Sequence, residues 1–105
     1  MVYAVYTTEP FDLSVVGLEK SERERIAKLY LKLAENPFAG DQLQYKHLRE
    51  KRLNGKRVYF LVYEDLRVVL IVAISGKKDQ QATINHIVSS FDKYKEYLGN
   101  LLRNN

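Results

Sequence analysis

The chain has 105 residues, of which 46% are hydrophobic, so we expect one folded domain spanning residues 1–105. The absence of cysteine excludes disulfides, thiolate catalysis and zinc–thiolate sites, and it fits a reducing cytoplasm. With two histidines, His47 and His86, and no carboxylates clustered around them, we expect no metal and no other cofactor. No apolar run is long enough for a transmembrane helix, and residues 1–4 do not begin a signal peptide.

The net charge of +4 is unevenly distributed along the chain. Nine of the seventeen basic residues lie between positions 46 and 78, where only Glu50, Glu64 and Asp65 oppose them. The nine are Lys46, Arg49, Lys51, Arg52, Lys56, Arg57, Arg67, Lys77 and Lys78. This segment therefore predicts a cationic surface that binds an acidic partner, either a nucleic acid or an acidic protein.

The first third of the chain predicts a strand and a helix. Residues 2–7 alternate around Val and Tyr and predict a strand, followed by a connection over residues 11–17 with one helical turn. Ser21 and Glu24 have the spacing of a capping box, and apolar residues then recur at helical spacing up to Glu35. Asn36-Pro37 ends this helix, because the residue before proline avoids helical dihedral angles.

The middle of the chain predicts three antiparallel strands. The first begins at Gln42 and would place His47 on the same face as Leu43 and Tyr45. Asn54-Gly55 predicts a tight hairpin with a type I′ turn, followed by a strand over residues 56–63. After a turn at residues 64–65, residues 67–74 are apolar on both faces and predict a central strand.

The last third predicts one long helix that begins after Thr83. Its apolar stripe consists of Ile84, Ile87, Val88, Phe91, Tyr94, Leu98 and Leu101. We expect this stripe to pack into the core, with docking of a partner helix as the alternative. The predicted fold is α+β, with a small four-stranded sheet that is antiparallel apart from a mixed edge, and helices packed on one face.

Three segments resemble the RelE/ParE/HigB superfamily of small bacterial and archaeal toxins. Residues 33–43, LAENPFAGDQL, are similar to the family's link between helix and sheet. Residues 55–63, GKRVYFLVY, are similar to its arginine-bearing strand, and residues 73–81, AISGKKDQQ, to the segment before a C-terminal helix. The order and spacing of the three segments carry the resemblance.

The resemblance implies a RelE/ParE-like toxin of a type II toxin–antitoxin pair, held silent by a cognate antitoxin in the cytoplasm. RelE- and HigB-like members cleave messenger RNA on the ribosome, through attack of a ribose 2′-hydroxyl on the neighbouring phosphate. ParE-like members share the fold and inhibit DNA gyrase instead, so a gyrase inhibitor, or an RNA- or protein-binding relative with weak catalysis, is the alternative.

Metal-independent cleavage of RNA needs a base, an acid and cations that stabilise the transition state. Arg57 matches the family's strand arginine, and its planar fork suits a phosphate. Lys77 and Lys78 are adjacent and repel each other, which favours loss of a proton from one of them, and His47 is a candidate base. The residues expected to bind RNA without catalysing its cleavage are Lys46, Arg49, Lys51, Arg52 and Lys56.

Each of these residues also has a structural interpretation. Arg57 could form an ion pair, Lys77 and Lys78 could lie in a solvated turn, and His47 could be an ordinary strand residue. Tyr45, Tyr59 and Tyr63 could stack on bases or pack within the protein. Asp79 is a possible acid–base group or a helix cap, so the sequence does not identify the general acid.

Overall fold

The computed structural model describes residues 2–104, which form an α+β fold. The elements in chain order are β1 (Ala4–Thr7), α1 (Glu9–Val16), α2 (Lys20–Glu35), β2 (Asp41–Gln42), β3 (Leu48–Leu53), β4 (Lys56–Tyr63), β5 (Val68–Gly76), the 3₁₀ turn η1 (Lys77–Asp79), α3 (Gln80–Ser89) and α4 (Phe91–Arg103).

The sheet has five strands in the order β1-β5-β4-β3-β2. Strand β1 pairs in parallel with β5, and the other neighbours are antiparallel. This confirms the predicted antiparallel sheet with a mixed edge and the central position of β5. The predicted count of four strands is one short, because the two-residue β2 pairs with β3. So short a strand leaves no alternating pattern in the sequence.

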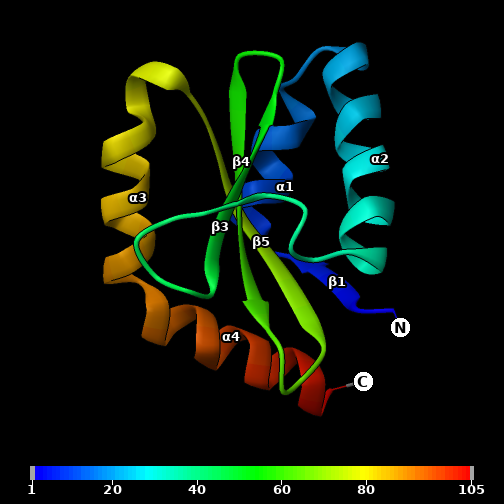
Figure 1. Ribbon diagram of the computed structural model, residues 1–105, viewed down its shortest axis with the longest axis vertical. Helices are drawn as coiled ribbons and strands as arrows, with labels where there is room; N and C mark the ends of the chain where they lie inside the picture. Colours follow the sequence, from blue (N-terminus) through cyan, green and yellow to red (C-terminus); the bar gives the residue numbers. More distant parts are fainter. Residues whose placement is uncertain (1, 105) are drawn as a thin grey trace.

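Helices cover both faces of the sheet, and the prediction of a single covered face is wrong. In Figure 1, α1 and α2 lie on one side of the strands, and α3 lies on the other side. The reason lies in the two central strands, β4 and β5. Most of their residues are buried whichever face they point to, so both faces need an apolar cover.

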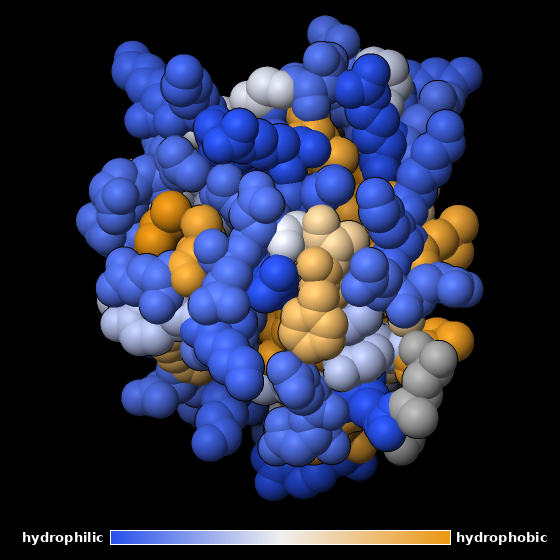
Figure 2. Space-filling model, in the orientation of Figure 1, coloured by the Kyte–Doolittle hydropathy of each residue, from blue (hydrophilic) through white to orange (hydrophobic). Residues whose placement is uncertain are grey.

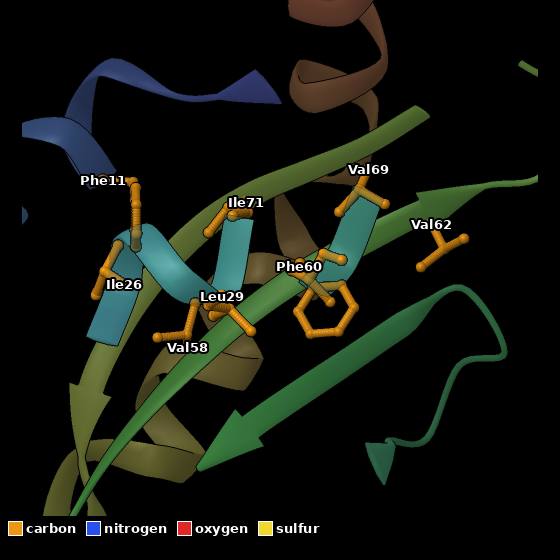
Figure 3. Packing of buried hydrophobic residues seen from close by; sticks show 9 residues of the cluster. Phe11, Ile26, Leu29, Val58, Phe60, Val62, Val69 and Ile71 are labelled. Carbon is orange, nitrogen blue, oxygen red and sulfur yellow. The ribbon is translucent and has the colours of Figure 1, made fainter. Parts of the chain in front are cut away.

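The hydrophobic core accordingly has two layers. The layer beneath α1 and α2 brings side chains of both helices against β4 and β5, as Figure 3 shows. Its buried members are Phe11, Ile26, Leu29, Leu33, Val58, Phe60, Val62, Val69 and Ile71. The layer beneath α3 consists of Leu48, Tyr59, Leu61, Leu70, Val72, Ile84 and Ile87. Alternate residues of β4 therefore belong to opposite layers.

The two N-terminal helices differ from the prediction: α1 is longer than the expected single turn, and α2 begins at another cap. Residues 9–16 form a true helix, α1, whose N-cap Thr8 accepts a hydrogen bond from the Phe11 amide at 3.4 Å. Helix α2 has Glu19 as its N-cap and Glu22 at position N3, and the Glu19 amide donates to the Glu22 carboxylate at 3.3 Å. The capping box thus lies two residues before the predicted Ser21–Glu24 pair, and both of those residues fall within the helix.

The β3–β4 hairpin confirms the prediction from Asn54-Gly55. Both residues have positive φ angles, 49° and 86°, as a type I′ turn requires. Leu53 and Lys56 pair across the turn, which fixes the register of the whole hairpin. Strand β3 begins at Leu48, however, and not at Gln42 as predicted. Residues 43–47 form a loop closed by hydrogen bonds between Leu43 and Leu48 and between Leu48 and Tyr45.

The predicted C-terminal helix is interrupted at Ser90 and forms α3 and α4. Thr83 lies within α3, whose N-cap is Asp79, so the predicted start is wrong by about one turn. The apolar stripe does pack inward, as predicted: Ile84, Ile87 and Leu98 are buried. Within residues 2–104, no helix combines the length and the apolar character needed to cross a lipid bilayer.

Candidate functional site

Six of the predicted cationic residues come together at the hairpin end of the sheet. Four are on the hairpin itself, and Lys77 and Lys78 follow β5 in the turn η1. The register brings these segments side by side, because Arg52 pairs with Arg57, and Lys56 pairs with Gly76. We call this group, Lys51, Arg52, Lys56, Arg57, Lys77 and Lys78, the cationic end. Hydrophilic side chains cover most of the upper edge of the molecule, where the hairpin turn lies in the view of Figure 2.

The hairpin cations divide between the two faces of the sheet. Arg52 and Arg57 face each other across the strands, and Arg57 is also paired with Ser75, so all three lie on the face covered by α3. Lys51 pairs with Val58, a member of the core layer beneath α1 and α2, and therefore points to the opposite face. The adjacent Lys51 and Arg52, which sequence alone groups together, therefore point to opposite faces at the same end of the sheet.

Arg57 is part of a buried network and is not a free surface cation. Its side chain is 9% exposed, and its Nε lies 3.6 Å from the Glu50 carboxylate, which is 4% exposed. The same carboxylate accepts hydrogen bonds from the Gln80 side-chain amide at 3.0 and 3.3 Å. The ion-pair interpretation of Arg57 is therefore confirmed.

The other cations of the cationic end are more accessible. Lys56 lies 3.7 Å from Glu22 of α2, a half-exposed pair that contributes little to stability. Arg52, Lys77 and Lys78 are exposed, and Lys51 is half-buried. Among residues 2–104, none of these four forms an ion pair, so their charge is available to an external anion.

Two of the residues expected to bind RNA lie away from the cationic end. The Arg49 guanidinium donates to the Gly40 carbonyl at 2.8 Å and lies 5.3 Å from the centre of the Phe38 ring. It thereby fastens the loop before β2 to β3, which is a structural role. Lys46 is exposed in the loop that precedes β3 and helps to line an open pocket of about 360 Å³ at the opposite end of β4.

His47 also lies at this distant end, and the structure does not bring it together with Arg57. Its carbonyl accepts a hydrogen bond from the Val62 amide. Val62 is five residues along β4 from Arg57, a distance of about 17 Å in a strand. The imidazole packs 4.7 Å from the Phe91 ring and 6.2 Å from the Tyr63 ring, and burial lowers its pKa. This geometry makes His47 a packing residue of the sheet and of α4.

The tyrosines considered for base stacking have packing roles. Tyr59 is fully buried, its hydroxyl lies 2.9 Å from the Ser75 hydroxyl, and burial raises its pKa. Tyr45 meets Phe91 edge to face at 5.2 Å, beside His47. Burial raises the pKa of Tyr63 to about 12, at the end of the sheet opposite the cationic end. For Tyr59, the absence of exposed surface excludes stacking on a base.

Sequence reasoning missed Glu50 and Gln80 as parts of this site. Glu50 was visible as the one acidic residue among the hairpin cations, and its partner follows from the turn. A two-residue loop at Asn54-Gly55 sets Glu50 opposite Tyr59, so Arg57 is its diagonal neighbour on the same face. Gln80 reaches Glu50 only because α3 packs back over the sheet, which no local pattern shows.

The cationic end can hold a phosphate, whereas groups for proton transfer are few there. Arginine and lysine nitrogens supply charge-assisted hydrogen bonds to phosphate oxygens. Within residues 2–104, the only histidines, His47 and His86, lie elsewhere, on the loop before β3 and within α3. Asp79, which follows Lys78 in η1, is an exposed carboxylate at this end. No three histidine, aspartate or glutamate side chains in the described residues are grouped so as to hold a metal ion.

Comparison with known proteins supports the fold through structure alone. The sequence matches no protein-family model and no curated protein. The structure matches a double arginine-to-alanine mutant of the E. coli toxin RelE in the free state, with a TM-score of 0.72 and 19% identity over 85% of this chain and 97% of that one. The chain has the RelE fold.

Complexes of RelE with the antitoxin RelB contain the same fold. The archaeal RelE–RelB complex from Pyrococcus horikoshii matches with a TM-score of 0.69 and 20% identity, over 73% of this chain and 97% of that one. The toxin–antitoxin complex RelBE2 from Mycobacterium tuberculosis matches with a TM-score of 0.66 and 15% identity, over 73% of this chain and all of that one. The resemblance seen in residues 33–43, 55–63 and 73–81 is thus confirmed for the RelE fold.

Proposed function

We propose that this protein is the toxin of a type II toxin–antitoxin pair and acts in the cytoplasm as a ribosome-associated mRNA endoribonuclease. The observation that carries the proposal is the cationic end of this RelE fold. Four of its cations form no ion pair within residues 2–104. Single-stranded RNA is a polyanion, and a phosphate backbone is attracted to such a cluster.

In the proposed reaction, the 2′-oxygen of a ribose attacks the adjacent phosphorus. The new O–P bond forms as the bond to the 5′-oxygen of the next nucleotide breaks, giving a 2′,3′-cyclic phosphate and a 5′-hydroxyl. Lys77 and Lys78 supply positive charge to the phosphorane-like transition state without a metal ion. Of the exposed groups at this end, Asp79 and the two lysines are the candidates for moving the 2′-proton and protonating the leaving oxygen.

A cognate antitoxin is the proposed protein partner. RelE of P. horikoshii has been solved with RelB, and RelBE2 of M. tuberculosis as a toxin–antitoxin complex; the fold that this chain shares with them supports the proposal. An antitoxin for this chain would be acidic or would cover the cationic end, because the exposed cations need a neutralising partner to keep RNA out.

The test is induced expression followed by mapping of mRNA 5′ ends. We expect growth arrest and discrete new 5′ ends inside coding regions, and we expect both to disappear in a Lys77→Gln/Lys78→Gln variant. These lysines are exposed, so the substitution should leave the fold unchanged. Growth arrest without new 5′ ends would contradict cleavage.

The second candidate is a ParE-like protein that binds and inhibits gyrase without catalysis. The observation favouring it is the burial of Arg57 against Glu50, together with the scarcity of proton-transfer groups around it. Loss of negative supercoiling in a reporter plasmid, with intact mRNA, would support this candidate. Cleaved mRNA with normal supercoiling would exclude it.

A further inference from the structure

The carboxylate of Glu50 is buried at the inner edge of the cationic end, next to Lys51 on β3. Glu50 is 3% exposed, although burying an unpaired carboxylate is costly. Both carboxylate oxygens accept hydrogen bonds from the side-chain amide of Gln80, and one of them lies 3.6 Å from Nε of Arg57. One acidic group therefore holds two partners that come from different parts of the chain.

Those two partners belong to the two segments that carry the cations. Arg57 lies on β4, directly after Lys56 and opposite Arg52. Gln80 is the first residue of α3 and follows the turn η1, which contains Lys77 and Lys78. Holding Gln80 in place therefore fixes where η1, the turn with Lys77 and Lys78, leaves the sheet. Holding Arg57 in place keeps its guanidinium beside that turn.

We propose that Glu50 is the positioning residue of the cationic end, holding the Arg57 guanidinium and the Lys77–Lys78 turn in one arrangement ready for a phosphate of RNA. The role rests on the proposed binding of RNA. Contact through Nε is the arrangement that leaves the two terminal nitrogens of the fork for a bidentate phosphate contact. Within residues 2–104, Arg57 donates no side-chain hydrogen bond to another residue, so the fork is not already used by the protein.

The negative charge of Glu50, rather than its shape, is what this role requires. A glutamine in its place keeps the volume and a polar contact with Gln80, but it no longer attracts the guanidinium. Arg57 is nearly surrounded by protein, so a loss of its counter-charge should let the side chain turn out of its site toward water. The phosphate contact would then lose its preorganised partner, whereas Lys77 and Lys78 would keep their charge.

The experiment measures affinity for a short single-stranded RNA with Glu50→Gln made in two backgrounds. In the wild-type background we expect affinity to fall roughly tenfold, as for loss of a charge-assisted hydrogen bond. In an Arg57→Lys background, which retains charge but has no fork to orient, we expect Glu50→Gln to change affinity less than about twofold. Equal losses in the two backgrounds, or no loss in the wild type, would overturn the proposal.

A second readout requires no RNA. The Nε–H signal of Arg57 in a ¹⁵N NMR spectrum should be slow to exchange with water in the wild type and fast in Glu50→Gln. The same slow exchange in both proteins would show that Glu50 does not hold Arg57. If the wild type binds no RNA, the proposed function fails, and the NMR signal still decides whether Glu50 positions the guanidinium. Should Glu50→Gln not fold, Glu50→Asp, which withdraws the carboxylate by one methylene, is compared in the same two ways, with the same pattern expected.

Discussion

At the scale of single residues, burial separates the cations that internal groups already contact from those that lie in solvent. Arg57 and Arg49 are bound to internal oxygens or carboxylates, whereas Arg52, Lys77 and Lys78 are exposed. The sequence predicted a role toward RNA for all five, because charge can be read from a sequence and burial cannot. The strand arginine that carried the family resemblance is the most buried of them.

The buried pair makes Arg57→Ala a stability variant as much as a functional one. Removing one partner leaves the Glu50 carboxylate buried without its counter-charge, which typically costs about 3–5 kcal/mol. We expect a drop of this size in the free energy of unfolding measured in urea. A double variant, Glu50→Gln/Arg57→Met, should recover most of the loss, because neither charge remains. A double variant as unstable as Arg57→Ala would contradict the pairing.

Gly40 is fixed by the close approach of its neighbours. A Cβ there would lie 2.9 Å from Cζ of the Phe60 ring and would also meet the Glu50 carbonyl oxygen on β3. We expect Gly40→Ala to lower the free energy of unfolding by about 1–3 kcal/mol through overpacking. Gly99→Ala is the matched control, since it adds a methyl to open space within α4 and should raise stability by about 0.5–1 kcal/mol. An unchanged Gly40→Ala protein would refute the close contact.

At the scale of whole elements, those defined by local chemistry were predictable, and those defined by tertiary contacts were not. The hairpin and β4 follow from Asn54-Gly55 and the residues around it. The loop over residues 43–47 was predicted as a strand because its alternation fits a strand, and only its closure by hydrogen bonds to Leu48 reveals the turn. The break between α3 and α4 at Ser90 has no proline or glycine to mark it.

His47 connects three of these elements, and its titration should be visible in stability. It lies in the loop before β3, against Phe91 of α4 and Tyr63 of β4. Burial lowers its pKa in the folded state, so the unfolded chain binds a proton first as the pH falls. Stability should therefore decrease as the pH falls through about 6.5, the ordinary histidine pKa, and on toward the lower pKa of the folded state.

The free energy of unfolding is measured by chemical denaturation of the wild type and two variants between about pH 7.5 and about pH 5. His47→Gln should lose less stability across this range than the wild type. His86→Gln, at an exposed position of α3, serves as the control and should follow the wild type. If His47→Gln and the wild type lost the same amount, the half-buried imidazole of His47 would not be the group responsible.

At the scale of the whole molecule, exposed basic residues lie at two opposite ends of the sheet. The cationic end lies at the hairpin turn, and α4 with its own exposed lysines lies at the other end of the sheet (Figure 1). The concentration of charge in residues 46–78 was predicted from sequence, and the fold gathers six of its nine cations at one end of the sheet. The positions of the other three cations, Lys46, Arg49 and Arg67, are set by strand register and by loop closure.

Four cations without ion pairs within residues 2–104 set the salt dependence expected for RNA binding. If each neutralises one phosphate, the logarithm of the affinity should fall with the logarithm of salt concentration at a slope of about −3 for single-stranded RNA. Lys77→Gln/Lys78→Gln should halve that slope. Lys93→Gln/Lys95→Gln removes two exposed lysines of α4 and should leave the slope unchanged. Equal effects of the two double variants would mean that the whole surface binds RNA, without a specific end.

The central claim, cleavage at the cationic end, is tested most directly with purified protein and ribosomes carrying a defined mRNA. We expect the wild type and Lys93→Gln/Lys95→Gln to cut the mRNA equally and to leave a 2′,3′-cyclic phosphate and a 5′-hydroxyl. Lys77→Gln/Lys78→Gln, folded as judged by circular dichroism, should cut at least about a hundredfold more slowly, in the range that transition-state electrostatics contribute. Full cleavage by the Lys77→Gln/Lys78→Gln protein, or intact mRNA with the wild type, would contradict it.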